Sequence, residues 1–82
     1  MKILPIDEEL KEYLQKHNLE LKFQKQIKFF EQNPFHPSLK TELLEPKELR
    51  FWSFRIYKKY RAIFIFYNRN TAEIIDVNNH YR

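Results

Sequence analysis

The segment from Arg50 to Asn70 constrains the fold most, because its side chains alternate with the period of a β-strand. It holds six basic side chains, eight of the chain's fourteen aromatic residues and no acid. Trp52, Phe54 and Ile56 would share one face of a strand here, and Ser53 and Arg55 would lie on the other. Basic charge interleaved with aromatic rings is typical of surfaces that bind a phosphate backbone and stack bases. The segment therefore predicts a sheet with a basic face.

The rest of the chain predicts an α+β fold. Asp7 is a candidate N-cap for a first helix that ends near Asn18. A second helix is expected from Leu19 to about Gln32, with a buried face at spacings of three and four formed by Leu19, Phe23, Ile27 and Phe30. We expect a short N-terminal strand and two helices packed on one face of a mostly antiparallel, four- to five-stranded sheet. The opposite face, which would carry Arg55 and Arg61, would be left open. The strands are expected at roughly residues 1–4, 41–44, 51–57, 60–67 and 71–77.

Turn chemistry is unusual because the chain contains no glycine. Tight turns are expected at Lys58-Lys59 and at Asn68-Arg69-Asn70. Without glycine, we expect asparagine to take any left-handed backbone conformation that the turns require.

Length and composition limit the remaining possibilities. The 82 residues predict one domain, residues 1–82, with a net charge of +4. The absence of cysteine excludes a disulfide scaffold, a zinc knuckle and a thiol nucleophile. The start of the chain lacks the apolar stretch of a signal peptide, and the longest apolar run, Ala62 to Tyr67, is too short to span a bilayer. We therefore expect a cytoplasmic protein that binds no membrane. Five lysines among acids on the predicted helices are interpreted as solubilising charges: Lys11, Lys16, Lys22, Lys25 and Lys28.

Several short motifs, taken in order, resemble a known family. They are Asn33-Pro34, Ser38-Leu39-Lys40, Phe51-Trp52-Ser53, Tyr60-Arg61 and a terminal His80-Tyr81. In this order and at these spacings the chain resembles the RelE/ParE superfamily of bacterial and archaeal toxins, and in particular its YoeB branch. The similarity covers nearly the whole chain. It implies the RelE-like fold, in agreement with the predicted elements.

The resemblance also implies a function. It suggests the toxin of a toxin–antitoxin pair, a metal-independent endoribonuclease that cuts mRNA on the ribosome and needs no cofactor. The ribose 2′-hydroxyl would attack the adjacent phosphate, giving a 2′,3′-cyclic phosphate or its opened 3′-phosphate and a 5′-hydroxyl. The implied partners are a cognate antitoxin protein, the ribosome and mRNA. Codon preference, the identity of the antitoxin and the oligomeric state are left open.

The resemblance assigns roles to individual residues. Glu42 matches the general base, Arg61 the arginine that stabilises the transition state, His80 the general acid and Tyr81 a tyrosine that orients substrate. A carboxylate, a guanidinium and an imidazolium suit this chemistry, which needs a base, positive charge at the phosphorane and an acid. No metal ligand is implied. The remaining basic positions are expected to bind RNA: Arg55, Lys40, Lys58, Lys59 and Arg82.

Each assignment has a simpler alternative. Glu42 on a short strand is also compatible with a solvated edge residue, and Arg61 with a structural ion pair to Asp76 or Glu73. At the level of function, the alternative is a catalytically inactive RelE-fold protein that binds RNA or an antitoxin without cleavage. A plain nucleic-acid-binding module is a third reading, although neither predicted helix has the pattern of a DNA recognition helix.

Overall fold

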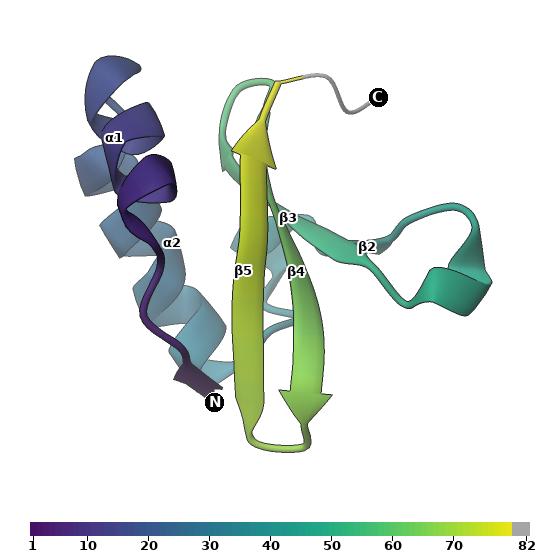
Figure 1. Ribbon diagram of the computed structural model, residues 1–82. Helices are drawn as coiled ribbons and strands as arrows, with labels where there is room; N and C mark the ends of the chain where they lie inside the picture. The colour runs from purple at the N-terminus through teal and green to yellow at the C-terminus, as the bar shows by residue number, and fades with distance from the viewer. Residues whose placement is uncertain (80–82) are drawn as a thin grey trace.

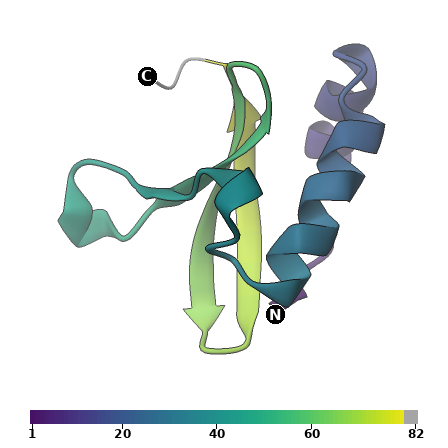
Figure 2. The same cartoon turned by 180° about the vertical axis from the view of Figure 1, so that it is seen from behind.

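The computed structural model describes residues 1–79, which form two helices and a five-stranded sheet (Figure 1). The strand order is β1-β5-β4-β3-β2, in which β1 runs parallel to β5 and every other neighbouring pair is antiparallel. Both helices lie on the same side of the sheet, whereas β2 and the loop after it project on the other side (Figures 1 and 2). The predicted α+β architecture is therefore confirmed. The elements are β1 (Lys2–Ile3), α1 (Glu8–Lys16), α2 (Glu20–Gln32), β2 (Glu42–Leu43), β3 (Trp52–Tyr57), β4 (Tyr60–Asn68) and β5 (Thr71–Asn78), with short 3₁₀ turns η1 (Pro37–Leu39) and η2 (Lys47–Leu49).

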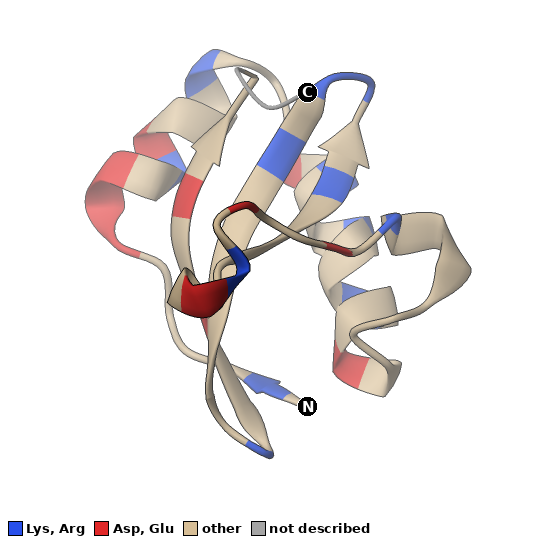
Figure 3. Ribbon diagram, turned by 90° about the vertical axis from the view of Figure 1, so that its right-hand side faces the viewer, with Lys and Arg blue, Asp and Glu red and all other residues tan. Residues whose placement is uncertain are grey.

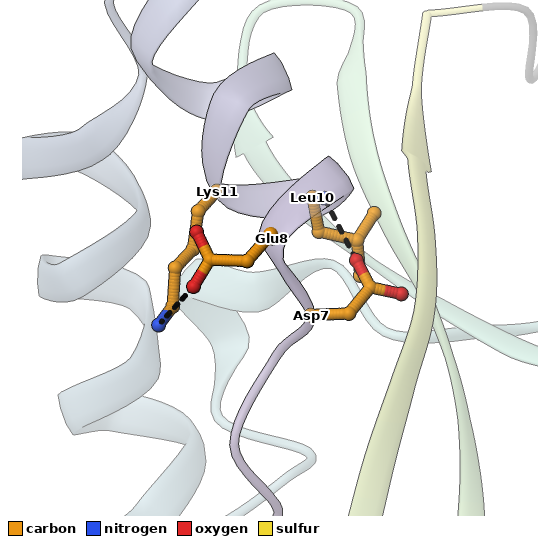
Figure 4. Close-up of polar contacts among 4 residues, drawn as sticks. All are labelled: Asp7, Glu8, Leu10 and Lys11. Atoms are coloured by element: carbon orange, nitrogen blue, oxygen red, sulfur yellow. Dashed lines mark hydrogen bonds and ion pairs between the residues drawn. The ribbon is translucent and has the colours of Figure 1, made fainter.

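Helix α1 begins where the sequence predicted. Asp7 has an extended backbone, and its side chain accepts a hydrogen bond of 2.9 Å from the backbone N–H of Leu10 (Figure 4). This bond satisfies one of the N–H groups that have no partner in the first turn. In the same turn, the Lys11 ammonium lies 3.6 Å from the Glu8 carboxylate. Both groups are largely exposed, so this ion pair contributes little to stability.

Helix α2 differs from the prediction in one residue of its buried face. Leu19, Phe23 and Phe30 are buried, as the spacing predicted, but Ile27 is only half-buried and Gln26 is buried instead. A buried amide requires hydrogen-bond partners, which a pattern of apolar residues does not reveal. Both described helices are shorter than a membrane-spanning segment would have to be.

Aromatic side chains fill the space between the helices and the sheet. Phe30 from α2 contacts Phe54 on β3 and Phe64 on β4, with ring centroids 5.3 and 4.9 Å apart. All three rings are fully buried. Small side chains on the inner strands, Ala62 and Ala72, are also fully buried and leave room for these rings. The core thus uses one face of the sheet, and the other face is available for a functional site.

The left-handed turns are made mainly by basic residues. Positive φ angles occur at Asn18 (55°), Lys40 (50°), Arg50 (57°) and Lys58 (49°) in the described residues. The prediction that asparagine would take all such positions is therefore wrong. A single left-handed residue costs only about 1–2 kcal/mol, so an unbranched side chain is tolerated where the surrounding contacts fix the turn. The turn at 68–70 instead uses the Asn68 side chain, which accepts a 2.8 Å hydrogen bond from the Asn70 N–H.

Candidate active site on the outer face of the sheet

Residues from four strands lie in two neighbouring cross-strand rows on the face opposite the helices. In the register of the sheet, Glu42 on β2 faces Ser53 on β3, and Arg55 on β3 faces Arg61 on β4. Arg61 in turn faces Asn78 on β5. Residues directly opposite each other share a face, as do alternate residues of one strand, so these side chains lie on the same surface. Figure 3 shows basic positions side by side on β3 and β4.

Arg61 is held by hydrogen bonds inside the protein. Its Nε donates to the Ser53 hydroxyl at 2.8 Å, and its Nη2 donates to the backbone carbonyls of Lys40 and, at 3.4 Å, Ser53. Only 8% of Arg61 is exposed, so the prediction that it stands on an open face is wrong. The reason is the segment before β2, which reaches Arg61 through the Lys40 carbonyl. A buried guanidinium needs such acceptors, because burying a charged group without hydrogen-bond partners for its N–H donors costs free energy.

The left-handed conformation of Lys40 explains how this contact arises. Lys40 ends η1 with a φ angle of 50°, and its own N–H bonds the Pro37 carbonyl at 3.3 Å. The chain then enters β2, which pairs with the first residues of β3. Lys40 was predicted to bind RNA through its ammonium. Its side chain is exposed, and the structure adds a second contribution, a backbone acceptor for Arg61.

Glu42 and Arg55 are both exposed, and they lie on β2 and β3, on the same side of the buried arginine in the strand order of the sheet. Glu42 on β2 pairs with Ser53, whose hydroxyl accepts the hydrogen bond of the Arg61 Nε. The Nε of Arg55 donates a hydrogen bond of 3.1 Å to the carbonyl of Lys58, so its side chain leans toward the β3–β4 turn. Lys58 and its exposed neighbour Lys59 occupy that turn, as predicted. A carboxylate and at least two guanidinium groups are therefore gathered on one surface.

Three of the predicted site residues, His80, Tyr81 and Arg82, lie outside the described residues. The nearest described strand residue is Asn78, the cross-strand partner of Arg61. His80 follows Asn78 by two positions in the sequence. Its role as general acid stays a prediction.

Ser53 was missed as a supporting residue by the sequence analysis. It was taken only as one of the outward-facing residues of β3, yet it is fully buried and accepts the hydrogen bond of Arg61. A signal was present, since a serine between Trp52 and Phe54 is out of keeping with an aromatic strand. A small hydroxyl at this position leaves space for the arginine side chain from the neighbouring strand.

Comparison with solved structures finds a clear similarity of fold. A YoeB/ParE toxin from Agrobacterium tumefaciens has the same architecture, with a TM-score of 0.75 over 99% of this chain and 100% of that chain. The two sequences are 23% identical. A scan against models of protein families finds no match, and a search among curated proteins likewise finds no similar sequence. The predicted RelE-like fold is thus confirmed.

Proposed function

We propose that this protein is the toxin of a toxin–antitoxin pair and that it cleaves mRNA on the ribosome. The proposal is supported by the shared fold with a YoeB/ParE toxin and by the surface that carries Glu42, Arg55 and Arg61. The gathering of these three residues, from three different strands, is the observation that carries it. These are the positions for which the sequence resemblance implies catalytic or RNA-binding roles.

The reaction follows from the chemistry of these groups. The Glu42 carboxylate takes the proton of the ribose 2′-hydroxyl as the 2′-oxygen forms a bond to the adjacent phosphorus. The bond from phosphorus to the 5′-oxygen breaks, and the His80 imidazolium gives its proton to that oxygen. A 2′,3′-cyclic phosphate and a 5′-hydroxyl result. Arg61 supplies fixed positive charge where the phosphorane forms, and such charge is most effective when it is held in place beforehand.

Arg55 has a different part in this scheme. It is exposed, carries a permanent charge and lies directly across the strand pair from Arg61. A phosphate that approaches Arg61 therefore also approaches Arg55. We assign Arg55 to substrate binding and Arg61 to the reacting phosphate.

A specific observation favours a second candidate function. Arg61 already donates to the Ser53 hydroxyl and to two backbone carbonyls, and it is nearly buried. These contacts also suit a structural arginine in a protein that keeps the fold and binds RNA or an antitoxin without cutting. In that case the exposed Arg55 would still bind phosphate, whereas Glu42 would have no catalytic role.

Cleavage by purified protein on programmed ribosomes, with the product ends mapped, distinguishes the two. We expect His80→Ala and Glu42→Gln each to lower single-turnover cleavage by about 10²–10⁴-fold, because each removes one proton-transfer step. Glu45→Gln is the matched control, since Glu45 is an exposed carboxylate outside the strands. Circular dichroism establishes that each variant is folded. Wild-type protein that binds programmed ribosomes but leaves the mRNA intact would support the inactive alternative. Cleavage by folded His80→Ala or Glu42→Gln at the wild-type rate would refute the proposed mechanism.

The proposed antitoxin is tested separately. Expression of the toxin alone should arrest growth and translation, and co-expression of the neutralising partner should restore both. We expect that partner to carry an acidic or amphipathic helical segment, because the toxin is basic, with a net charge of +4. Growth arrest that persists in the Glu42→Gln variant would separate toxicity from RNA cleavage.

A further inference from the structure

A basic cavity lies between α2 and β3, at the end of the row that contains Arg55. We call it the α2–β3 cavity; it measures about 370 Å³. Of the described residues that line it, four are basic and none is acidic. Its lining consists of Lys22, Lys25 and Gln26 from α2, Ser38 from η1, and Arg55, Ile56, Tyr57 and Lys58 around the end of β3.

The four basic side chains come from two segments that are far apart in the sequence. Lys22 and Lys25 are one helical turn apart on α2, whereas Arg55 lies on β3 and Lys58 in the turn that follows β3. The Tyr57 ring contacts one basic side chain from each of these segments, with the Lys22 ammonium 4.3 Å and the Lys58 ammonium 5.3 Å from its centroid. Both distances are within the range of cation–π attraction. The ring therefore holds two ammonium groups at the same cavity.

A buried amide fixes the distance between helix and strand. Gln26 is only 8% exposed, and its Nε2 donates to the Ser38 carbonyl at 3.0 Å and to the Arg55 carbonyl at 2.6 Å. These bonds join α2 to η1 and to β3. Hydrogen bonds thus fix the relative positions of the backbone segments that carry the four basic side chains. The four charges are presented on a rigid frame, which lowers the entropic cost of binding a ligand.

The charge distribution points to an anionic ligand. Four positive groups around one concave site repel one another, and this repulsion lowers the stability of the folded chain. A bound anion removes the repulsion. A cluster of positive groups that lowers the stability of the free protein is expected at a site where a bound ligand supplies negative charge.

We propose that the α2–β3 cavity binds a backbone phosphate of the same RNA strand whose neighbouring phosphate reacts at Arg61. The inference rests on the proposed function, since it takes RNA as the ligand. Arg55 lines the cavity and also faces Arg61 across the strands, so one continuous strand reaches both places. Tyr57, 40% exposed, offers part of an aromatic surface beside the phosphate, which suits a nucleic acid better than an acidic peptide. Lys22 and Lys25 then belong to the RNA site and are not only solubilising charges.

Fluorescence anisotropy with a non-cleavable RNA tests this assignment without depending on catalysis. The probe is a labelled single strand of about ten nucleotides with methylated 2′-hydroxyls, within the site sizes of single-strand-binding folds. Binding is measured at roughly 0.05–0.3 M salt, because each neutralised phosphate contributes about 0.7 to the slope of log K against log salt. The test variant is Lys22→Gln/Lys25→Gln. The control is Lys16→Gln/Lys28→Gln, which removes two exposed helical lysines that do not line the cavity.

The expected result follows from counterion release. Loss of two phosphate contacts should flatten the slope by about 1.4 and weaken binding about 25-fold at 0.1 M salt, or about fivefold for each lysine. The control should bind like the wild type. Urea unfolding of both variants establishes that they are folded, and both lysines of the test pair are exposed, so their replacement leaves the core intact.

Three outcomes would overturn the inference, and they are distinguishable. If the wild type binds RNA and the test and control variants have the same affinity and slope, the cavity is not part of the RNA site, and the proposed function stands. If the wild type binds no RNA at any salt concentration and does not cut on ribosomes, the inference and the proposed function fail together. If Lys22 and Lys25 matter for binding a poly-glutamate peptide but not for RNA, the cavity serves an acidic protein segment.

Discussion

Replacing Ser53 with alanine tests whether Arg61 is positioned by the hydroxyl group on β3. Ser53 is fully buried and Arg61 is 8% exposed, so solvent has little access to the bond of 2.8 Å between them. Alanine removes the hydroxyl that accepts this bond from a charged group. Hydrogen bonds to charged groups contribute about 1.5–3 kcal/mol. We expect Ser53→Ala to lower the free energy of unfolding by that amount, a large share of the stability of a small domain.

Urea unfolding followed by tryptophan fluorescence measures this loss, since Trp52 is the single tryptophan and lies beside Ser53 on β3. The matched control is Ser38→Ala, in which an exposed serine is replaced and its backbone carbonyl still accepts from Gln26. In an Arg61→Met background the effect of Ser53→Ala should largely disappear, because the interaction has already been removed. Equal losses, within about 0.5 kcal/mol, for the Ser53 and Ser38 variants would refute the proposed support of Arg61.

The same variant separates positioning from folding in the proposed reaction. A displacement of about 1 Å in a catalytic group can cost about 100-fold in rate. Under conditions where Ser53→Ala remains folded, we expect single-turnover cleavage to fall about 10–100-fold while affinity for the ribosome is retained, because Arg55 and the exposed lysines are unchanged. A parallel loss of affinity, with the rate of bound enzyme preserved, would assign Arg61 to binding instead.

Two further predictions concern the hydrogen bonds of α2 and the environment of α1. Gln26→Leu should lower the free energy of unfolding by about 1–3 kcal/mol, because two backbone carbonyls of η1 and β3 lose their donor, whereas the exposed Gln24→Leu should have little effect in the same urea assay. Burial raises the pKa of Tyr13 above its usual value near 10, and the charges of Tyr60 and Asp76 raise it further. The folded state therefore favours the neutral phenol, so this contribution to stability is complete below about pH 10 and is lost as the pH rises through the folded pKa. Urea unfolding from roughly pH 9 to 11.5 should show a steeper decline for the wild type than for Tyr13→Phe, and identical declines would contradict this.

Local features of the sequence predicted the architecture because they act over short distances. The N-cap at Asp7 and the apolar spacing of α1 and α2 depend only on neighbours within the helix. The alternation from Trp52 onward likewise fixes which side chains of β3 face the core. Once two amphipathic helices and an antiparallel meander are given, few arrangements bury both apolar surfaces, so the fold class follows.

The surroundings of Arg61 were not predictable in this way. Its burial depends on where the chain runs between η1 and β2, and that path is set by the left-handed residue Lys40 and by two pairs of residues joining β2 to β3. The Lys40 carbonyl that contacts Arg61 lies 21 positions away in the sequence. Strand alternation assigned Arg61 to the outer face correctly, but alternation carries no information about what covers that face.

Lys22 and Lys25 illustrate the same limit for charge. In the sequence they are lysines on an amphipathic helix that also carries acids, a pattern that usually means a solvated surface. They line a basic cavity only because the fold places Arg55, Lys58 and the ring of Tyr57 next to them. Lys28 lies on the same helix and is also exposed, but it does not line the cavity. If charge alone governed RNA binding, replacing Lys28 would weaken it as much as replacing Lys25. If the cavity governs it, only the Lys25 variant should lose affinity, and this contrast within one helix separates a site from a merely basic protein.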